Sequence, residues 1–303
     1  MKSIFLLLPS LLLAQAPIVS GDAELRGEVL GKPLVLRTST RMAGAIESFV
    51  WGGVEFIDRA DHGRELQSAI NANVDGVYHV ECYNPTEAGS VFDGAGPTST
   101  SVLRSLSTAG GVLRTETQMA FWLKPGGQSH GKPAQNTTAL SNHSLRKEVK
   151  IGLSGLENVL DYKVIFQVPA DLKHTYLQFE ALTGYMPGAF STELFFEPKD
   201  GSLAALPRKN GEVLRPVVLA TADGAQAMGV YSPTRPAGFR SGVGYGRFQF
   251  EPEKVVKWNC VFRLKEPAGA KAGDYPFQLY VVFGSREDCR RALVALHERF
   301  PAQ

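Results

Sequence analysis

Short runs of β-branched and aromatic residues alternate with Gly, Pro, Asn and Asp along almost the whole chain. Runs of this kind, bounded by turn residues, are typical of β-strands. Because they recur more than a dozen times, the pattern predicts an all-β fold, a large two-sheet antiparallel sandwich (a supersandwich). The clearest runs are residues 32–38, 46–57, 77–82, 112–123, 148–153, 159–168, 176–182, 193–196, 217–222, 227–231, 244–250, 255–264 and 276–283.

Two stretches depart from this pattern. Residues 126–144 are polar and aperiodic, which predicts a long exposed loop of the kind that often borders a binding site. Near the C-terminus, Ser285 and Asp288 have the spacing of a capping box. Apolar residues then follow at helical spacing, so we expect one C-terminal amphipathic helix packed on the sandwich. They are Cys289, Ala292, Leu293, Leu296 and Phe300.

The N-terminus has the three parts of a secretory signal. Lys2 gives a positive start, residues 4–13 are mostly apolar, and Ala14-Gln15-Ala16 is a small-x-small cleavage site. About ten apolar residues reach about 15 Å as a helix, half of a bilayer core of roughly 30 Å. The sequence therefore predicts a cleaved signal peptide at 1–16, a single β-sandwich domain at 17–303, no stable membrane anchor, and a secreted or periplasmic location.

Composition narrows the range of partners and cofactors. The formal charge is +2, and +1 without Lys2, with acids and bases interspersed, so no basic stripe for nucleic acid is expected. Cys82, Cys260 and Cys289 lack C-x-x-C spacing, which argues against a metal site and permits either one disulfide or three buried thiols. Motifs for a phosphate loop, an H-E-x-x-H metal centre or a serine-hydrolase elbow are absent, and no cofactor is expected.

The densest cluster of chemically capable residues lies between Asp58 and Asp93. Strand alternation from Gly63 would put Arg64 on one face with His62, and Glu65 on the other. In a predicted strand over residues 77–83, alternation would place His79, Glu81 and Tyr83 on one face and Val80 and Cys82 on the other. If these residues only line a solvent face, the cluster is structural; if they converge, they form a binding groove.

Such a polar face suits a saccharide, because sugar hydroxyls need convergent donors and acceptors and the ring needs an aromatic platform. We expect His62, Arg64, Glu81 and Tyr83 to converge in one groove. Candidate catalytic residues are His62, Arg64 and Glu81, with Glu81 or Glu65 as the proton carrier, His62 as a second acid or base and Arg64 holding a hydroxyl or carboxylate. Candidate substrate contacts are Glu65, His79, Tyr83, Asn84, Glu87 and Tyr185.

Several of these segments resemble galactose mutarotase-like β-sandwich proteins. The opening Gly44-Ala45-Ile46-Glu47-Ser48, the stretch from Trp51-Gly52-Gly53 to Ile57, and Asp61-His62-Gly63-Arg64 are similar to the opening of that superfamily. Thr221-Ala222-Asp223-Gly224 with Met228-Gly229-Val230-Tyr231 resembles a late hairpin in it. The resemblance implies a sugar-contacting Arg or His after the first strands and a later catalytic Glu, for which Glu180, Glu193 and Glu197 remain open.

The resemblance implies a carbohydrate-active protein that acts as a hydrolase, lyase or epimerase. A fold does not determine its function, so a non-catalytic carbohydrate-binding or structural module is the alternative. A metal-dependent enzyme that uses His62, His79 and a carboxylate is a third hypothesis, without a spacing motif to support it.

Overall fold

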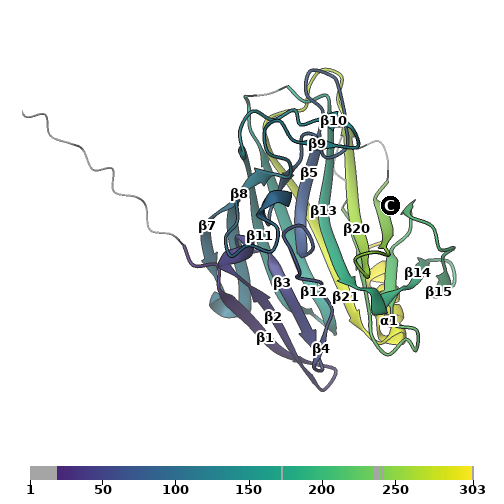
Figure 1. The fold of residues 1–303 in the computed structure, drawn as a ribbon. Coiled ribbons are helices and arrows are strands. Elements are labelled where there is room, and N and C mark those ends of the chain that lie inside the picture. Colours follow the sequence, from purple (N-terminus) through teal and green to yellow (C-terminus); the bar gives the residue numbers. More distant parts are fainter. Residues whose placement is uncertain (1–18, 172, 235–238, 240–241, 302–303) are drawn as a thin grey trace, which may run out of the picture.

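Two layers of antiparallel strands make up the body of the molecule (Figure 1). The computed structural model describes residues 19–171, 173–234, 239 and 242–301. The predicted signal peptide at 1–16 lies outside these residues. The outer layer runs, neighbour by neighbour, through β7 (Val102–Ser107), β8 (Val112–Phe121), β11 (Leu140–Leu153), β12 (Leu156–Val168), β21 (Gly273–Gly284), β18 (Ala227–Tyr231), β17 (Val217–Ala220), β14 (Thr192–Glu197) and β15 (Ser202–Ala205).

The inner layer lies against it and carries the groove described below. It runs through β1 (Ala23–Val29), β2 (Lys32–Thr38), β3 (Ile46–Trp51), β5 (Leu66–Ala72), β13 (Tyr176–Pro187), β20 (Val255–Lys265), β19 (Gly244–Phe250) and β16 (Gly211–Val213).

Short elements connect the layers and line their edges. The strand β6 (Pro85–Thr86) pairs with both β5 and β8 and so joins the two layers into one 19-stranded sheet, while β4 (Val54–Glu55) extends the β3 hairpin. A second sheet holds β9 (Gln128–Ser129) and β10 (Lys132–Pro133). The remaining elements are α1 (Arg286–Arg299) and the 3-10 turns η1 (Thr40–Met42), η2 (Val91–Asp93), η3 (Ala109–Gly111) and η4 (Gly188–Phe190).

Alternation along the strands divides their side chains between two apolar cores. In β21, Leu279 and Val281 face the core between the layers, whereas Tyr280 and Val282 face a second core under α1. Both faces of β21 are therefore buried, which explains its continuous apolar run. The helix packs on the outer layer through Cys289, Ala292, Leu293 and Leu296.

The all-β sandwich with one C-terminal helix is confirmed. The capping box of α1 is also present, because the backbone N–H of Asp288 donates to Ser285 Oγ at 3.1 Å and that of Ser285 to Asp288 Oδ2 at 2.9 Å. All three cysteines are buried free thiols. Among the described residues, no helix has the length and apolarity needed to cross a membrane.

Two local predictions were wrong. Residues 78–84 form turns and irregular chain instead of a strand, with Glu81 in the left-handed region at a φ of 64°. The predicted loop at 126–144 contains the β9–β10 hairpin and ends where β11 begins at Leu140. In β11, His143, Leu145 and Lys147 alternate into the interior and are all buried. The start of this strand was not recognised because a His and a Lys occupy inward positions that are usually apolar.

Candidate functional site

A groove of about 730 Å³ crosses the face of β5, β13, β20 and β19 that is turned away from the core. Alternate residues of these strands form its floor. On β20, Val256, Trp258 and Cys260 enter the core while Lys257 and Asn259 face the groove. The floor residues are Gln67, Ala69, Asn71, Gln178, Glu180, Thr183, Tyr185, Phe248, Phe250, Val255, Lys257, Asn259 and Arg263.

A β-bulge in β13 changes which residues reach this floor. The register with β20 shifts between Glu180 and Leu182, so Ala181 and Leu182 are both buried in the core. As a result Glu180 and Thr183 lie on the same face, and Thr183 Oγ1 donates to Glu180 Oε2 at 2.9 Å. A bulge that redirects a side chain in this way is common next to functional sites.

Glu180 and Lys257 form an ion pair in the middle of the floor. Lys257 Nζ lies 3.1 Å from Glu180 Oε2, and only 12% and 15% of the two side chains is exposed. Burial alone would raise the pKa of Glu180, but the charge of Lys257 and hydrogen bonds from Lys257, Thr183 and Asn259 lower it. The Lys257 pKa is raised: burial opposes its charge, but Glu180 outweighs that effect. Both groups therefore stay charged near neutral pH.

A second charged pair stands at the end of the floor. Arg263 contacts Glu212 of β16 with Nη1 at 2.8 Å and Nη2 at 2.6 Å, a bidentate arrangement. Its Nε donates to Gln178 Oε1 at 3.0 Å, and Gln178 also accepts from the hydroxyl of Tyr176. This network fixes the orientation of the Gln178 amide in the groove.

Aromatic side chains lie beside the Glu180–Lys257 pair. The rings of Tyr185 and Phe250 are stacked, with centroids 6.0 Å apart and planes 21° from parallel. Lys257 Nζ is 5.0 Å from the centroid of Tyr185 and 5.5 Å from that of Phe248, within the range of cation–π contacts. Burial raises the pKa of Tyr185, so its hydroxyl remains a donor at neutral pH.

The turn before β5 forms one wall. Arg64 holds Asp61 through Nε at 2.9 Å and Nη2 at 2.9 Å. His62 is buried, and its Nδ1 and Nε2 each lie 2.7 Å from a carbonyl oxygen, those of Gly94 and Arg41. Both ring nitrogens are occupied by backbone, so His62 ties neighbouring loops together and neither nitrogen is free for acid–base chemistry or a metal.

Glu81 and Asn84 reach the opposite wall from an irregular segment. Glu81 Oε2 accepts from Ser129 Oγ of β9, and the Glu81 backbone N–H donates to Asn71 Oδ1 at 3.0 Å. Asn84 Nδ2 donates to the Ile70 carbonyl at 2.6 Å. These contacts place both side chains along the groove beside β5.

Five of the residues singled out from the sequence line the groove: His62, Arg64, Glu81, Asn84 and Tyr185. Glu65 and Glu87 do not, because both are buried. Glu65 accepts from the Gly63 backbone N–H, and burial raises its pKa well above the usual value. Glu87 forms a fully buried ion pair with Lys147.

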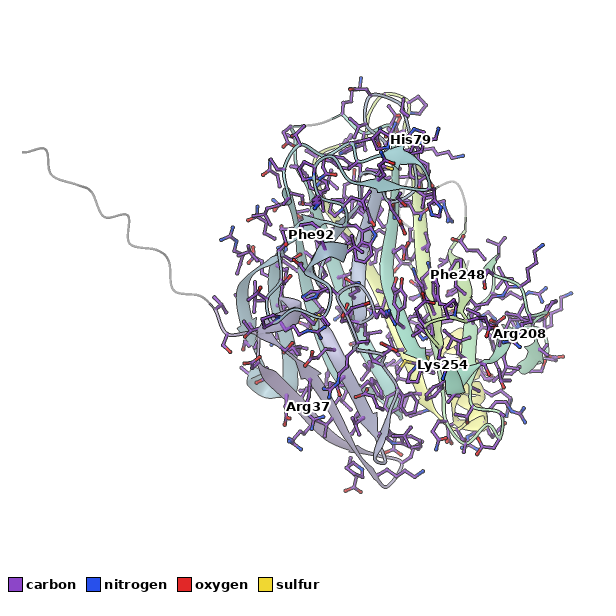
Figure 2. The ribbon with its side chains drawn as sticks, viewed as in Figure 1. Arg37, His79, Phe92, Arg208, Phe248 and Lys254 are labelled. Carbon is purple, nitrogen blue, oxygen red and sulfur yellow. The ribbon has the colours of Figure 1, made fainter. Side chains whose placement is uncertain are left out.

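Tyr83 and His79 also lie outside the groove. Tyr83 packs in the interior, with its ring centroid 4.7 Å from Phe121 and 5.2 Å from His174. His79 lies in irregular chain just before the turn at residues 80–83, at the end of the molecule (Figure 2). The expected convergence of four residues therefore holds for His62, Arg64 and Glu81 and fails for Tyr83, because residues 77–82 do not alternate as a strand.

Sequence reasoning missed most of the floor. Lys257, Asn259 and Arg263 lie on the polar face of a strand whose other face is apolar, so the sequence pattern was sufficient to identify them. Trp122, whose ring lies against Gly63, also lines the groove. Of the three candidates for the later catalytic glutamate, only Glu180 lines the groove among the described residues. Glu193 lies near Arg247, and Glu197 pairs with Arg215.

The described fold is similar to several solved structures. The Slr1438 protein of Synechocystis sp. PCC 6803 has a TM-score of 0.45 at 9% identity, covering 94% of this chain and 100% of that one. A glycosyl hydrolase family 38 protein from Enterococcus faecalis has a TM-score of 0.49 at 10% identity, covering 89% of this chain. A GH36 α-galactosidase from Geobacillus stearothermophilus has a TM-score of 0.45 at 8% identity, covering 88%.

The chain spans only 32% and 40% of the lengths of the two hydrolases. No protein-family model matches the sequence. The comparison with curated proteins gives no match either. Each of these three likenesses extends over most of the described sandwich at 10% sequence identity or less.

Proposed function

We propose that this chain is a secreted carbohydrate-active protein that binds a saccharide in the groove across β5, β13, β20 and β19. The observation that carries the proposal is the floor itself, where stacked Tyr185 and Phe250 adjoin a row of oriented polar groups. The rings offer an apolar platform for one face of a sugar. Asn259, Gln178 and Thr183 offer donors and acceptors for its hydroxyls.

Charges in the groove favour an uncharged sugar. Among the described residues, its lining contains five carboxylates and three cations, and each of these cations pairs with a lining carboxylate. A uronate or sulfated sugar would bring a further negative charge beside this excess, and no cation in the described part of the lining is unpaired to receive it. A lyase acting on a uronate is therefore the least favoured of the three reaction types. The carboxylates are Asp61, Glu81, Glu180, Glu212 and Glu253, and the cations are Arg64, Lys257 and Arg263.

If the protein turns its ligand over, Glu180 is the proposed proton acceptor. Its lowered pKa keeps it ionised at neutral pH, as a general base requires. Once Glu180 has taken up the proton and lost its charge, Lys257 would hold a developing negative charge, and the Tyr185 hydroxyl would serve as a donor. Arg64 and Glu81 then act as contacts at the groove wall. A non-catalytic module remains the second candidate, because the charged groups on the floor already satisfy one another.

The test is binding of the purified protein to a panel of neutral and acidic glycans by calorimetry, with product analysis for turnover. We expect a neutral glycan to bind and Phe250→Ala to weaken that binding by about tenfold, the effect of losing roughly 1.4 kcal/mol of ring contact. Phe92→Ala is the matched control, since Phe92 is an exposed aromatic outside the groove lining. Absence of binding, or equal loss in both variants, would overturn the proposal.

Turnover separates the two candidates. In an enzyme, Glu180→Gln should retain the neutral glycan and lose product formation. A binding module should form no product with any glycan, while Phe250→Ala still weakens binding.

A further inference from the structure

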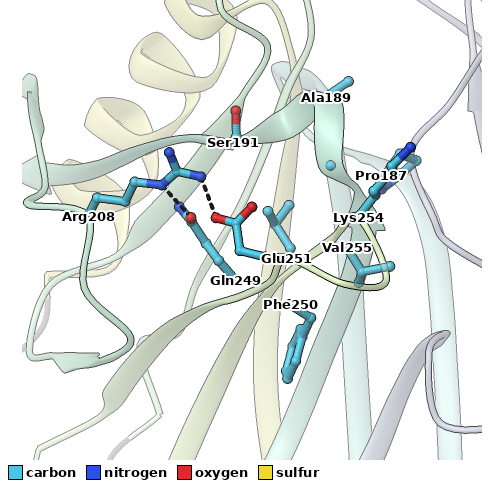
Figure 3. A pocket seen from close by; sticks show the side chains of 11 residues that line it. Pro187, Ala189, Ser191, Arg208, Gln249, Phe250, Glu251, Lys254 and Val255 are labelled. Carbon is cyan, nitrogen blue, oxygen red and sulfur yellow. Dashed lines mark hydrogen bonds and ion pairs between the residues drawn. The ribbon is translucent and has the colours of Figure 1, made fainter.

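A second pocket of about 480 Å³ opens beyond the end of β19, between η4 and the turn at residues 251–254 (Figure 3). We call it the Arg208 pocket. Close backbone contact shapes its edge: the Gly188 N–H donates to the Lys254 carbonyl at 2.7 Å, and a Cβ on Gly188 would meet the same oxygen at 2.7 Å. Its lining is Pro187, Gly188, Ala189, Ser191, Arg208, Gln249, Phe250, Glu251, Lys254, Val255 and Val256.

The Arg208 pocket and the groove share a wall. Phe250 and Val255 line both, and they are direct partners in the pairing of β19 with β20. Phe250 is 36% exposed and stacks on Tyr185 of the groove. The two cavities therefore adjoin at Phe250 and Val255.

Polar groups in the Arg208 pocket are oriented before any ligand binds. Arg208 Nε donates to Gln249 Oε1 at 2.6 Å, and Nη2 contacts Glu251 Oε1 at 2.6 Å (Figure 3). A guanidinium has five N–H groups, so three remain without a partner among the described residues. These N–H groups and the hydroxyl of Ser191 can donate hydrogen bonds to the oxygens of a sugar.

We propose that the Arg208 pocket is a second sugar-binding subsite, so that the ligand is an oligosaccharide passing over Phe250 rather than a single sugar. The inference rests on the proposed saccharide function of the groove. At about 730 Å³ the groove already has the size of an ordinary small-ligand site, roughly 300–1,000 Å³. A contiguous further 480 Å³ takes the combined site beyond that range.

The opposite charge balance of the two cavities points to the same ligand. In the Arg208 pocket two cations, Arg208 and Lys254, face one carboxylate, Glu251, whereas carboxylates are in excess in the groove. An anionic chain would be repelled by the groove and a cationic chain by the pocket. A neutral oligosaccharide suits both sections.

The test compares chain lengths. Dissociation constants are measured by calorimetry for neutral homo-oligosaccharides of one to six residues built from glucose, galactose, mannose or xylose, in α and β linkage. We expect the tetramer of the preferred series to bind at least about tenfold tighter than its monomer. Ala189→Trp, at an exposed position in the pocket, should abolish that gain and leave the monomer affinity unchanged. Ala109→Trp is the matched control, because Ala109 is also exposed and lies on η3, outside the linings of both cavities.

A second variant guards against a steric artefact of the Trp. Arg208→Gln removes a charged donor, worth about tenfold, and should reduce the tetramer affinity alone. The second subsite is overturned if monomer and tetramer bind equally well, or if the tetramer keeps its full advantage over the monomer in Ala189→Trp and Arg208→Gln. Either result leaves the groove proposal intact. If no member of any series binds, both proposals fail.

Discussion

Thr183 donates a hydrogen bond of 2.9 Å to Glu180, although the two residues are three positions apart in one strand. Regular alternation would place them on opposite faces. The bulge at Ala181 and Leu182 brings them together, beside Lys257 on the next strand. The central charge pair of the groove therefore depends on a local irregularity of β13.

Neutralising Glu180 should destabilise the protein, because it leaves Lys257 as an unpaired, largely buried charge. We expect Glu180→Gln to lower the free energy of unfolding by about 3 kcal/mol. The double variant Glu180→Gln with Lys257→Met should recover much of that loss, since no buried charge remains. Urea denaturation of the single and double variants measures both effects. A double variant less stable than Glu180→Gln would show that the pair is not coupled in this way.

The same strands show how far the sequence leads. Turn residues and apolar runs were enough to predict the sandwich and the C-terminal helix, because burial of alternate residues imposes a period of two or 3.6. The floor of the groove was missed for a physical reason. Its residues come from strands distant in sequence, and the β13 bulge breaks the alternation that would identify Glu180 and Thr183 as neighbours.

The opposite error affected residues 77–83. His79, Glu81 and Tyr83 have the spacing of a strand face, but the chain turns there and Glu81 adopts a left-handed conformation. Periodicity cannot distinguish a short strand from a turn with alternating residues. Only His62, Arg64 and Glu81 of the four expected residues then reach the groove. Contacts to segments far away in the sequence hold His62 and Glu81, whereas Arg64 is held by Asp61, three residues before it.

A methyl group at Gly184 should disturb the core packing beneath the groove floor. A Cβ at this position would lie 2.5 Å from the indole ring of Trp258, which is fully buried. We expect Gly184→Ala to destabilise the protein by about 1–3 kcal/mol, the usual result of overpacking a core. The measurement is thermal unfolding followed by tryptophan fluorescence. Gly27→Ala is a milder control, because its nearest neighbour is an Ile151 methyl at 3.2 Å; equal losses would contradict the argument.

The capping box of α1 predicts a smaller effect. Ser285→Ala removes the acceptor for the Asp288 backbone N–H at the start of the helix. The loss should be about 1 kcal/mol, which corresponds to a decrease in Tm of about 2 °C in a domain of this size. Differential scanning calorimetry measures this decrease in Tm, with Ser105→Ala, at an exposed strand position, as the control. If both variants melt together, the cap does not stabilise the native state.

Acid should destabilise the fold through His143. Both ring nitrogens of this residue are buried and have no hydrogen-bond partner in the part of the chain that the structure describes. Its ring centroid lies 6.0 Å from that of His174. Burial and the charge of His174 lower the pKa of His143 from 6.5 to about 3, while Asp171 acts weakly in the opposite direction. The native state therefore binds fewer protons than the unfolded state between these two values, and stability falls as the pH decreases from about 6.5 towards 3.

The expected loss between pH 7 and pH 5 from this residue is about 2 kcal/mol, because the unfolded imidazole is protonated at pH 5 and the folded one is not. His143→Phe should remove that part of the pH dependence while packing against Tyr83, whose ring is 6.1 Å from that of His143. Urea unfolding at both pH values measures it, with the exposed His130→Asn as the control. A pH dependence in His143→Phe as steep as in the unaltered protein would assign acid sensitivity to other groups.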